Sequence, residues 1–490
     1  MTNSLSVDYL IIGSGFGGLC MAAKLLAEGR DNLLIVEKAV QVGGTWRENV
    51  YPGAECDIPS SLYSYSFWPN PTWDFKWSGQ AQILDYLTRF AEAHGIAKHI
   101  QFQSEVHAAA YDQENGLWRV RLGDNQEIVC HYLIPAVGQL HHPQLPVIEG
   151  MESFDGISFH SAQWPQGLDL SAKNVGVIGN AASAVQFVPE IAKQAKSVTV
   201  YQRSPNWLWP KPNRPYSSLE KWLAKYIPSL AGVYRFSLWL QSEFILYPII
   251  KGNRWLGAIG ERVSKHHVKR LVADEKLQKQ LIPDYPLGGK RILFTTDYLK
   301  AIGRGLAELV TGKIERITPS GIDVTVEGAQ QKRQHDVLVY ATGFYTNPFL
   351  KGIDIVGKNG VKLSQHWHNG AHAYLGVQTA HFPNMFMLYG PNTNTGHTSV
   401  VLKHEAQVAM ILRLIEAIEA RSGMRSIEVK AGAEQKFNNE IDLRLRKMPW
   451  NKVAGSWYKD GDRITNNWPG SGREYQQRTG SPILDHFEFA

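Results

Sequence analysis

Cysteine is scarce in this chain, at three residues among 490. Cys20, Cys56 and Cys130 lie far apart in the sequence and form no Cys-x-x-Cys pair. This spacing gives neither a disulfide framework nor a zinc-binding motif, and it argues against a reductase that works through a redox-active cysteine pair. We therefore expect a protein that stays in a reducing cytoplasm.

The chain also lacks a large excess of charge and a membrane span. Its 51 Lys and Arg stand against 45 Asp and Glu, and the formal net charge of +6 is not gathered into a basic tail, so nucleic acid is not an expected partner. The N-terminus, residues 1–6, is short and polar and has no signal-peptide pattern. The most apolar long stretch, residues 232–250, contains Arg235 and Glu243 and does not read as a stable membrane insertion. A helical cap packed on the core is favoured there over a helix lying on a membrane surface.

Length and composition predict a soluble, folded protein with two or three domains. A chain of 490 residues exceeds the length at which a single hydrophobic core stops growing. With 43% hydrophobic and 20% charged residues, the composition is that of a globular protein without disordered or low-complexity segments. A folded enzyme is the default expectation.

A glycine-rich loop between an apolar strand and a helix lies close to the N-terminus. Residues 7–12 have the pattern of a buried strand, and GSGFGG follows at 13–18. Residues 19–27 then read as a helix, and a second strand at 33–36 ends in Glu37. This order is the strand–helix–strand fingerprint of a dinucleotide-binding fold.

Each characteristic residue of that fingerprint has a physical role. Gly13 permits the tight turn, Gly15 lets the backbone approach a pyrophosphate, and Gly18 lets helix and strand pack closely. The free N–H groups at the start of the helix bind the phosphates. Glu37 is expected to accept hydrogen bonds from a ribose hydroxyl.

The pattern recurs in the middle of the chain. Residues 175–178 read as a strand, GNAASA follows at 179–184, and 197–201 reads as the next strand. Here Ala181 and Ala184 stand in place of the second and third glycines. A strand–helix unit without a ligand is the alternative interpretation of such a weakened motif.

The spacing of the two motifs argues against that alternative. Glu37 follows Gly13 by 24 positions, and Arg203 follows Gly179 by the same 24 positions. A carboxylate at the ribose-reading position repels a 2′-phosphate, whereas a guanidinium offers several donors and a fixed positive charge. The second nucleotide is therefore expected to be NADPH. Two such folds, one ending in Glu and one in Arg, suggest a flavin cofactor, FAD, paired with a nicotinamide reductant.

The remaining patterns complete a two-part organisation. Each half closes with a similar strand and turn, at 132–138 and at 337–343. The second half is longer by roughly a helical hairpin, which we assign to residues 215–285 from their helical spacing of apolar and charged residues. After this half the chain is expected to return to the first domain, with a strand and turn at 382–391 and a helix at 404–419.

The predicted fold class is α/β, with two Rossmann-like dinucleotide-binding domains and a helical insertion in the second. The FAD-binding domain is expected at residues 1–145 and, as a second part with a C-terminal loop, at 336–490. The NADPH-binding domain is expected between them at 146–335, with the insertion at about 215–285.

Two further motifs resemble a known family. FDGISFHSAQWP at 154–165 matches in full the Phe-x-Gly-x-x-x-His-x-x-x-Trp-Pro signature of type I Baeyer-Villiger monooxygenases. GGTWRENVYPGAECD at 43–57 is similar to that family's Gly-Gly-x-Trp segment, which continues through Tyr-Pro-Gly to an aspartate. The resemblance, which covers nearly the whole chain, implies that FAD, NADPH and O2 convert a ketone to an ester or lactone through a flavin peroxide.

The resemblance also weighs against three alternatives. Flavin monooxygenases that oxygenate nitrogen or sulfur usually carry Tyr or Phe where Trp164 stands and lack the segment that ends in Asp57. A flavoprotein reductase or oxidase would show a redox cysteine pair or a separate acceptor site. A non-catalytic flavin-binding protein is disfavoured because Asp57 and Arg291 are both present.

The resemblance assigns roles to four residues. Arg291 corresponds to the catalytic arginine, Asp57 to the aspartate that holds it, and Lys290 to a lysine that supports Arg203 at the 2′-phosphate. Trp457 is similar to the tryptophan of a mobile C-terminal loop that closes over NADP. The alternatives are a solvated surface residue for Arg291, a turn cap for Asp57 and a core aromatic for Trp457. For His160, between the two glycine loops, an interdomain hydrogen bond is favoured over acid–base chemistry.

A permanently charged guanidinium suits this reaction for a physical reason. It stabilises a peroxide anion and the oxyanion formed after attack on a carbonyl, and it cannot give up its proton. The ketone and the oligomeric state cannot be read from the sequence. No metal is expected, and the full set of candidate cofactor-binding residues is Gly13, Gly15, Phe16, Gly18, Glu37, Lys38, Gly44, Thr45, Trp46, Asp57, Tyr63, Val106, Gly179, Asn180, Ser183, Arg203, Ser204, Lys290, Arg291 and Trp457.

Overall fold

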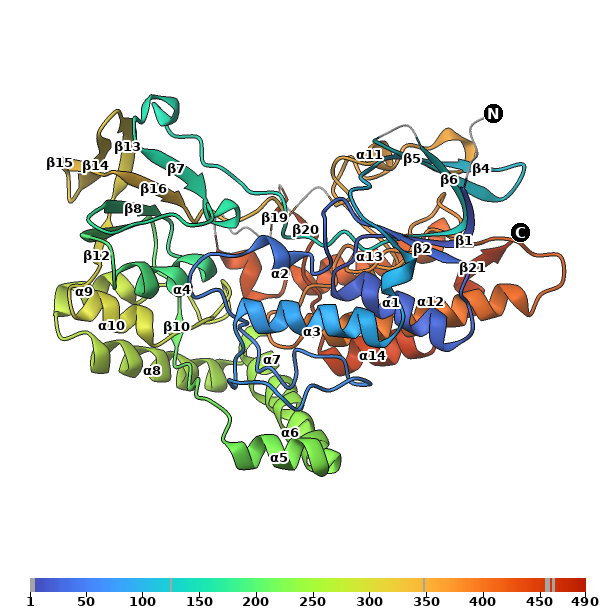
Figure 1. Ribbon diagram of the computed structural model, residues 1–490, viewed down its shortest axis with the longest axis horizontal. Helices are drawn as coiled ribbons and strands as arrows, with labels where there is room; N and C mark the ends of the chain where they lie inside the picture. The colour runs from blue at the N-terminus through green and yellow to red at the C-terminus, as the bar shows by residue number, and fades with distance from the viewer. Residues whose placement is uncertain (1–4, 124–125, 347–348, 454–458, 461–462) are drawn as a thin grey trace.

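Two separate β-sheets organise the chain, one for each glycine loop (Figure 1). The computed structural model describes residues 5–123, 126–346, 349–453, 459–460 and 463–490. In the view of Figure 1 the first sheet lies at the upper right and the second at the upper left. Helices occupy the lower part of the molecule. The predicted fold class, α/β with two dinucleotide-binding folds, is confirmed.

The first sheet has seven strands in the order β17-β4-β5-β6-β1-β2-β3. Its inner strand β1, between β6 and β2, runs parallel to both neighbours and has buried apolar residues on both sides. Tyr9 and Ile11 face a core shared with the helices, and Leu10 and Ile12 face a second core on the other side. The strands are β1 (Leu5–Ile12), β2 (Leu33–Val36), β3 (Ile100–Gln101), β4 (Val106–Asp112), β5 (Leu117–Leu122), β6 (Glu127–Pro135) and β17 (Asp354–Val356).

Three helices that are distant in the sequence pack against this sheet and against one another. Helix α1 (Phe16–Ala27) contacts both α3 (Gln80–Ala93) and α12 (Val400–Glu419), and all three contribute to one hydrophobic core. Helix α12 confirms the helix expected at 404–419. The C-terminal part of the chain thus completes the first half of the molecule.

The second sheet is fully parallel, in the order β12-β9-β8-β16-β7. Its strands are β7 (Ile157–His160), β8 (Asn174–Ile178), β9 (Ser197–Gln202), β12 (Glu308–Thr311) and β16 (Val337–Tyr340). Helices α4 (Ala182–Ile191) and α10 (Asp297–Gly303) pack together on it. The domain boundary expected between 335 and 336 is therefore wrong, because β16 pairs with β8 and β7 and belongs to the second sheet.

A second expectation also fails. Residues 382–391 do not form a named strand, and a single bridge joins Leu133 to Met385. Positive φ angles at Asn384 and Tyr389 interrupt the extended backbone that a ladder requires. The segment is nevertheless buried and runs beside β6, where the Phe386 N–H donates to the carbonyl of Leu133.

The region expected as a helical insertion contains helices α5 (Ser218–Tyr226), α6 (Pro228–Gln241), α7 (Tyr247–Ile250), α8 (Arg254–Leu271) and α9 (Glu275–Leu281). A π-helical segment, Ser242–Leu246, joins α6 to α7.

Among the described residues, no helix has the length and apolar character needed to cross a bilayer. The other elements are α2 (Thr45–Glu48), α11 (Leu363–His366), α13 (Ala431–Leu445), α14 (Gly472–Gly480), β10 (Leu208–Trp209), β11 (Leu293–Phe294), β13 (Lys313–Thr318), β14 (Gly321–Val326), β15 (Ala329–Gln334), β18 (Ile427–Val429), β19 (Lys459–Asp460), β20 (Arg463–Ile464) and β21 (Phe487–Phe489).

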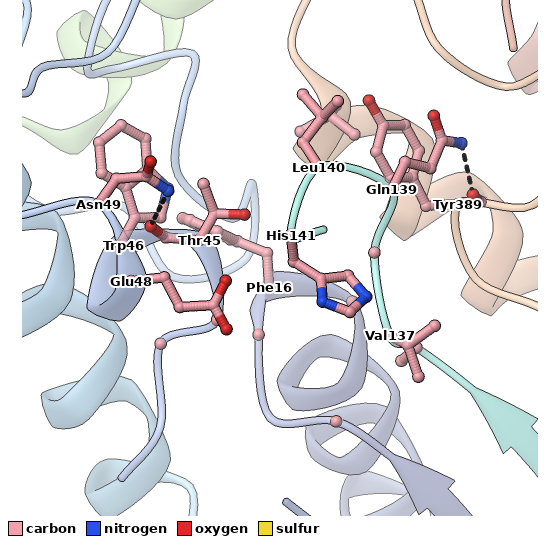
Figure 2. A pocket seen from close by; sticks show the side chains of 18 of the residues that line it. Phe16, Thr45, Trp46, Glu48, Asn49, Val137, Gln139, Leu140, His141 and Tyr389 are labelled. Carbon is pink, nitrogen blue, oxygen red and sulfur yellow. Dashed lines mark hydrogen bonds between the residues drawn. The ribbon is translucent and has the colours of Figure 1, made fainter. Parts of the chain in front are cut away.

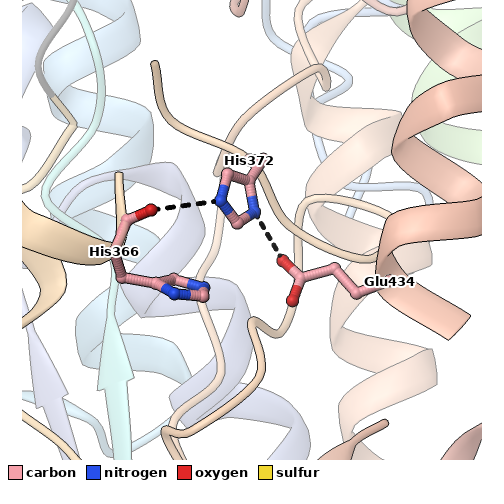
Figure 3. A group of neighbouring side chains, drawn as sticks. All are labelled: His366, His372 and Glu434. Carbon is pink, nitrogen blue, oxygen red and sulfur yellow. Dashed lines mark hydrogen bonds and ion pairs between the residues drawn. The ribbon is translucent and has the colours of Figure 1, made fainter. Parts of the chain in front are cut away.

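A group of polar side chains ties α11 and the segment after it to α13 (Figure 3). His372 Nδ1 lies 2.8 Å from Glu434 Oε1, and His366 lies beside this pair. Glu434 also accepts hydrogen bonds from the Thr379 hydroxyl and the Ala380 N–H. Both carboxylate oxygens thus have protein partners, which offset the cost of burying this side chain.

His335 couples the stability of the second half to pH. It is buried, and its Nε2 lies 2.6 Å from the Tyr201 hydroxyl. Burial, aided by the charge of Arg333 and opposed by Asp336, lowers the pKa of His335 to about 4 from its ordinary 6.5. As the pH falls below 6.5 the unfolded chain takes up this proton first, so stability decreases from about pH 6.5 towards pH 4.

We predict that His335→Gln reduces this acid sensitivity. Between pH 7 and pH 5 the wild type should lose about 2 kcal/mol of unfolding free energy through His335, and the variant should not. Urea unfolding followed by tryptophan fluorescence at the two pH values measures the difference. His368→Gln, at an exposed histidine, is the control. Equal acid sensitivity of the wild type and the His335 variant would contradict the assignment.

Candidate active site

A cavity of about 440 Å³ lies between the two halves (Figure 2). Its walls come from the first glycine loop, the 43–58 segment, the start of α4 and the 394–400 loop. Thirteen of the predicted site residues line it: Gly13, Gly15, Phe16, Glu37, Lys38, Gly44, Thr45, Trp46, Asp57, Tyr63, Val106, Ser183 and Arg291. The cavity is thus the place where most of the predicted cofactor contacts meet.

Side chains fixed by local contacts shape the wall of the cavity. Figure 2 shows the Asn49 amide donating to the carbonyl of Thr45 and the Gln139 amide donating to the carbonyl of Tyr389, at 2.9 Å and 2.6 Å. The Trp46 indole donates to the Tyr63 hydroxyl at 3.2 Å, and the two rings meet edge to face. Both aromatic rings are therefore held in place on one side of the cavity.

The glycines of the first loop are required for different physical reasons. Gly13 has a φ of +101°, which requires glycine whatever the surrounding space. At Gly15 the φ is −81°, and an added Cβ would meet the nearest protein atom, Gly44 Cα, only at 3.8 Å. A Cβ at Gly18 would collide with the carbonyl oxygen of Gly13. Gly15 thus keeps space open towards the cavity, whereas Gly18 allows close packing inside the protein.

The second loop meets the same backbone demands with fewer glycines. Gly179 has a φ of +112°, close to that of Gly13. Ala181 has a φ of −87°, a backbone angle that alanine adopts without strain. Ala184 is fully buried, so this loop has room for a methyl group where the first loop has none. The two alanines therefore leave the turn itself intact.

The start of α1 offers free N–H groups to the cavity. No side chain among the described residues caps this helix at Gly15, and its first turn holds no acidic residue. A helix N-terminus of this kind attracts anions through its unpaired donors and its dipole. Helix α4 likewise begins at the cavity, at Ala182 and Ser183, without a side-chain cap at Ala181 among the residues the structure describes.

Glu37 fastens the loop as well as lining the cavity. Its Oε2 accepts hydrogen bonds from the N–H and hydroxyl of Ser14, and its Oε1 accepts them from the Ala39 N–H and from Arg47. Burial opposes ionisation of this carboxyl, but these donors outweigh it and hold the pKa of Glu37 below its usual value. A ribose hydroxyl that binds Glu37 must replace one of these donors.

Four other predicted residues gather at the edge of the second sheet. Lys290 Nζ donates to the Ser204 hydroxyl at 2.8 Å, and the Asn180 amide donates to the Ser204 carbonyl at 3.0 Å. Burial and then the neighbouring charge of Arg203 lower the pKa of Lys290, against a weaker effect of Asp284. Two cations held this close favour an anion between them.

Arg291 and Asp57 meet across the two halves. Arg291 Nη2 donates to Asp57 Oδ2 at 2.8 Å, and the other carboxylate oxygen, Oδ1, accepts from the Gln186 amide at 3.1 Å. The side chain of Arg291 is 37% exposed and that of Asp57 15%, so the guanidinium keeps access to the cavity while the carboxylate lies deeper. The alternative of a freely solvated arginine does not fit this contact.

No pattern in the sequence indicates the residues that hold this pair and the segment around Asp57. Gln186, on α4, also donates to the Glu55 carbonyl and accepts from the Tyr51 hydroxyl. Lys211 is buried and donates to the Cys56 carbonyl at 3.1 Å, and it forms an ion pair with Glu55 at 2.6 Å. These contacts connect positions more than 130 residues apart in the sequence, which local patterns do not reveal.

The sequence analysis left the roles of several further residues in and around the cavity open. His160 accepts the Ala162 N–H within its own segment at 3.1 Å, and its ring also has a backbone hydrogen bond with Gly343, which follows β16. The interdomain hydrogen bond expected of His160 stays a prediction. Burial lowers the pKa of His404, which lines the cavity, to about 4. Burial raises the pKa of Cys56 to about 12, so its thiol is unreactive at neutral pH. Trp457 lies outside the described residues.

Comparison with known proteins gives consistent matches over nearly the whole chain. Residues 10–237 match the family model described as pyridine nucleotide-disulphide oxidoreductase. A Baeyer-Villiger monooxygenase of Pseudomonas aeruginosa is 36% identical over 473 residues, which cover 94% of this chain and 87% of that protein. One of Streptomyces coelicolor is 34% identical over 484 residues, covering 98% and 92%. The crystal structure of OTEMO in complex with FAD and NADP is 28% identical, with a TM-score of 0.87 over 100% of both chains.

Substitution by alanine should have different effects at Gly15 and at Gly18. Gly15→Ala should leave the apoprotein folded, because the methyl group meets no protein atom closer than 3.8 Å, but it should abolish FAD binding by occupying the pyrophosphate space. Gly18→Ala should lower the melting temperature, because its methyl group meets the Gly13 carbonyl. Flavin absorbance per chain and thermal unfolding of the apoproteins separate the two effects. Normal FAD content in Gly15→Ala would refute the assignment of this loop.

Proposed function

Since the chain belongs to the Baeyer-Villiger monooxygenases, which oxidise ketones to esters or lactones with FAD and NADPH, we propose that Arg291 and Asp57 are its catalytic pair. The observation that carries this proposal is the hydrogen bond between Arg291 and Asp57 at the wall of the cavity. It joins a permanent positive charge to a partly buried carboxylate that fixes its direction.

We propose that FAD binds along the first glycine loop. The open start of α1, the space beside Gly15 and the carboxylate of Glu37 supply the donors, room and acceptor that a dinucleotide needs. Further contacts are proposed for the other residues of this wall, namely Phe16, Lys38, Gly44, Thr45, Trp46, Tyr63 and Val106. Gly13 and Gly18 act through the shape of the loop.

The 2′-phosphate of NADPH is proposed to bind between Arg203 and Lys290, beside Ser204. The lowered pKa of Lys290 supports this, because part of the lowering comes from repulsion between Lys290 and Arg203. An anion bound between the two cations would offset that repulsion. Gly179, Asn180 and Ser183 are proposed to contact the rest of the nucleotide at the start of α4. Trp457 remains a proposed contact of the closing loop.

Arg291 acts on charge that develops during the reaction. Bound FAD, reduced by NADPH, supplies the activated oxygen that attacks the ketone. Arg291 directs its fixed charge at the carbonyl oxygen, which becomes negative on attack, and the low-dielectric cavity strengthens this effect. Because a guanidinium keeps its proton at any working pH, it does not quench basic oxygen species beside it.

Asp57 and Gln186 position the guanidinium. Asp57 accepts from Arg291 with one oxygen and from Gln186 with the other, so its carboxylate cannot rotate freely. Gln186 lies on α4, whose first residues line the cavity. The orientation of the catalytic arginine is thereby coupled to the element proposed to bind NADPH.

Several broader expectations remain proposals. We propose a small-molecule ketone and O2 as the reactants and no nucleic-acid partner. The FAD-binding part is proposed to comprise residues 1–145 and the chain after β16, with the NADPH-binding part between them. A cytoplasmic location is proposed because the three cysteines are free and buried. Oxygenation of nitrogen or sulfur is the less favoured activity.

Cofactor choice tests the second nucleotide site. Arg203→Ala with Lys290→Ala should erase the preference for NADPH over NADH, mainly by raising the Michaelis constant for NADPH, because two charges on the 2′-phosphate are lost. Steady-state NAD(P)H oxidation by the wild type and the double variant measures this. Lys279→Ala combined with Lys332→Ala, at two exposed lysines, removes the same charge and is the control. Equal use of both nucleotides by the wild type would overturn the assignment.

Arg291 tests the proposed chemistry. Arg291→Ala should retain FAD and part of the NADPH-dependent flavin reduction, but ester formation should fall by roughly a hundredfold to a thousandfold, or about 3 to 4 kcal/mol. The variant should release H2O2 in place of ester. NADPH loss, H2O2 and ester are measured in one sample. Arg291→Lys should restore little, since an ammonium does not reproduce the planar fork, and near wild-type ester formation by Arg291→Ala would exclude a catalytic role.

A further inference from the structure

Exposed apolar side chains are concentrated in one short part of the chain. Of the 24 large hydrophobic residues that the described part exposes, 12 lie between residues 219 and 263, about a tenth of the sequence. Nine of them form what we call the hairpin patch, on α5, α6 and the π-helical segment: Leu219, Trp222, Tyr226, Ile227, Leu230, Val233, Phe236, Phe244 and Ile245. In Figure 1, α5 and α6 project from the lower edge of the molecule, away from both sheets.

Helix α6 and the π-helical segment have clearly different faces. Arg235 points inwards and donates to the carbonyl of Ser61, and the buried Glu243 accepts the N–H groups of Gly472 and Arg473 at the start of α14. The two charges within this apolar stretch are therefore its anchors to the rest of the protein. The outer face carries Phe236 at 56% and Phe244 at 60% exposure, eight residues apart.

Helix α8 repeats this arrangement. Its inner face is fixed by the Ser264 hydroxyl, which donates to the Leu208 carbonyl, and by His267 Nε2 beside the Thr295 carbonyl. Its outer face carries Trp255, Ile259 and Val263 at a spacing of four residues, all exposed. The expected cap packed on the core thus describes only the inner faces of these helices.

The same region carries the positive charge of the whole chain. Residues 218–271 contain nine Lys or Arg and three Asp or Glu, a net charge of +6, which equals the formal net charge of all 490 residues. Of the three acidic residues, Glu243 is buried and Glu220 forms ion pairs with Arg214 and Lys76. Of the nine cations, Lys221 pairs with Asp74 and Lys265 with Glu261. Apolar and aromatic side chains bordered by an excess of cations are the pattern of a helix that lies in the interface of an anionic membrane.

We propose that the hairpin patch, together with the outer face of α8, docks this enzyme on an anionic lipid surface. A second copy of the chain fits less well, because a symmetric contact would bring two regions of charge +6 together. Arg235 and Glu243 are bonded to the rest of the protein on the inner face, so in this proposal the segment lies on the surface of the bilayer and does not cross it. Aromatic residues such as Trp222 and Trp255 suit the headgroup region, where one end of the ring is apolar and the other is wet.

Docking there would bring the cavity close to the membrane. The Ser242 hydroxyl, at the start of the π-helical segment, lies 3.3 Å from the hydroxyl of Thr398, which lines the cavity. Ser61, the partner of Arg235, lies two residues from Tyr63, another lining residue. Ketones dissolved in the lipid are therefore the substrate class that this arrangement favours.

Vesicle binding by the intact holoenzyme tests the proposal. We expect co-sedimentation with vesicles that contain phosphatidylglycerol, weaker binding to pure phosphatidylcholine, and weakening by added salt. Trp222→Ser, Phe236→Ser and Phe244→Ser combined should lower the affinity roughly tenfold or more. Lys225→Glu with Arg254→Glu should remove the preference for anionic lipid.

The control likewise replaces three exposed apolar residues by serine, but outside the patch, namely Val147→Ser, Leu443→Ser and Ile483→Ser. It should bind as the wild type does, and both triple variants should keep their FAD. No binding by the wild type, or equal loss in the control, would overturn the proposal. Dissociation of a wild-type dimer by the patch substitutions, seen by light scattering without vesicles, would assign the patch to a second copy instead.

A second readout depends on the proposed ketone oxidation, whereas vesicle binding does not. Anionic vesicles should accelerate oxidation of a long-chain ketone by the wild type and leave a short, water-soluble ketone unaffected. The patch variant should lose only this acceleration. Failure of all ketone oxidation with intact vesicle binding would count against the activity alone, and failure of binding with intact oxidation would count against docking alone.

Discussion

The arrangement of the site depends on one ion pair between parts of the chain that fold on different sheets. Asp57 belongs to a segment beside the first sheet, and Arg291 lies after α9 in the second half. Each ion would be costly to leave unpaired in the cavity wall, so the contact between them also fixes how the two halves meet. Gln186 and Lys211 strengthen this junction, because both reach from the second half to the backbone or side chains of residues 55–57.

The two glycine loops show that a binding motif combines requirements of different physical origin. A positive φ at positions 13 and 179 is a property of the backbone turn, and both loops keep glycine there. The absence of a Cβ at Gly15 and Gly18 concerns space, either towards the cavity or between helix and strand. In the second loop, Ala181 and Ala184 replace only the glycines that are needed for space, and the loop accommodates their methyl groups. The second motif therefore departs from the glycine pattern but keeps its turn.

The sequence predicted what short-range patterns determine. Strands β1, β2, β8 and β9, helices α1 and α12 and the glycine-loop part of the cavity wall followed from apolar periodicity and motif spacing. The strand expected at residues 382–391 was wrong. The segment has the apolar composition of a strand, but the left-handed backbone at Asn384 and Tyr389 interrupts the extended conformation. The contacts of Gln186 and Lys211 were also missed, since each depends on the relative placement of two sheets and leaves no local signature.

The outward apolar face of α6 raises the question of why this hairpin does not turn that face into the core. The hydrophobic effect is non-directional and does not by itself decide which apolar face of a helix is buried. The orientation of the helix is therefore determined by the face whose polar groups form specific hydrogen bonds with the rest of the protein. Glu243 supplies such partners, because rotating it outwards would leave the Gly472 and Arg473 N–H groups at the start of α14 without their acceptor. Pro248 adds a local constraint, since it cannot donate to the carbonyl of Phe244 and thereby favours the wider π-helical turn in which Glu243 lies. A few buried polar contacts thus determine which face of the hairpin remains available to a lipid surface.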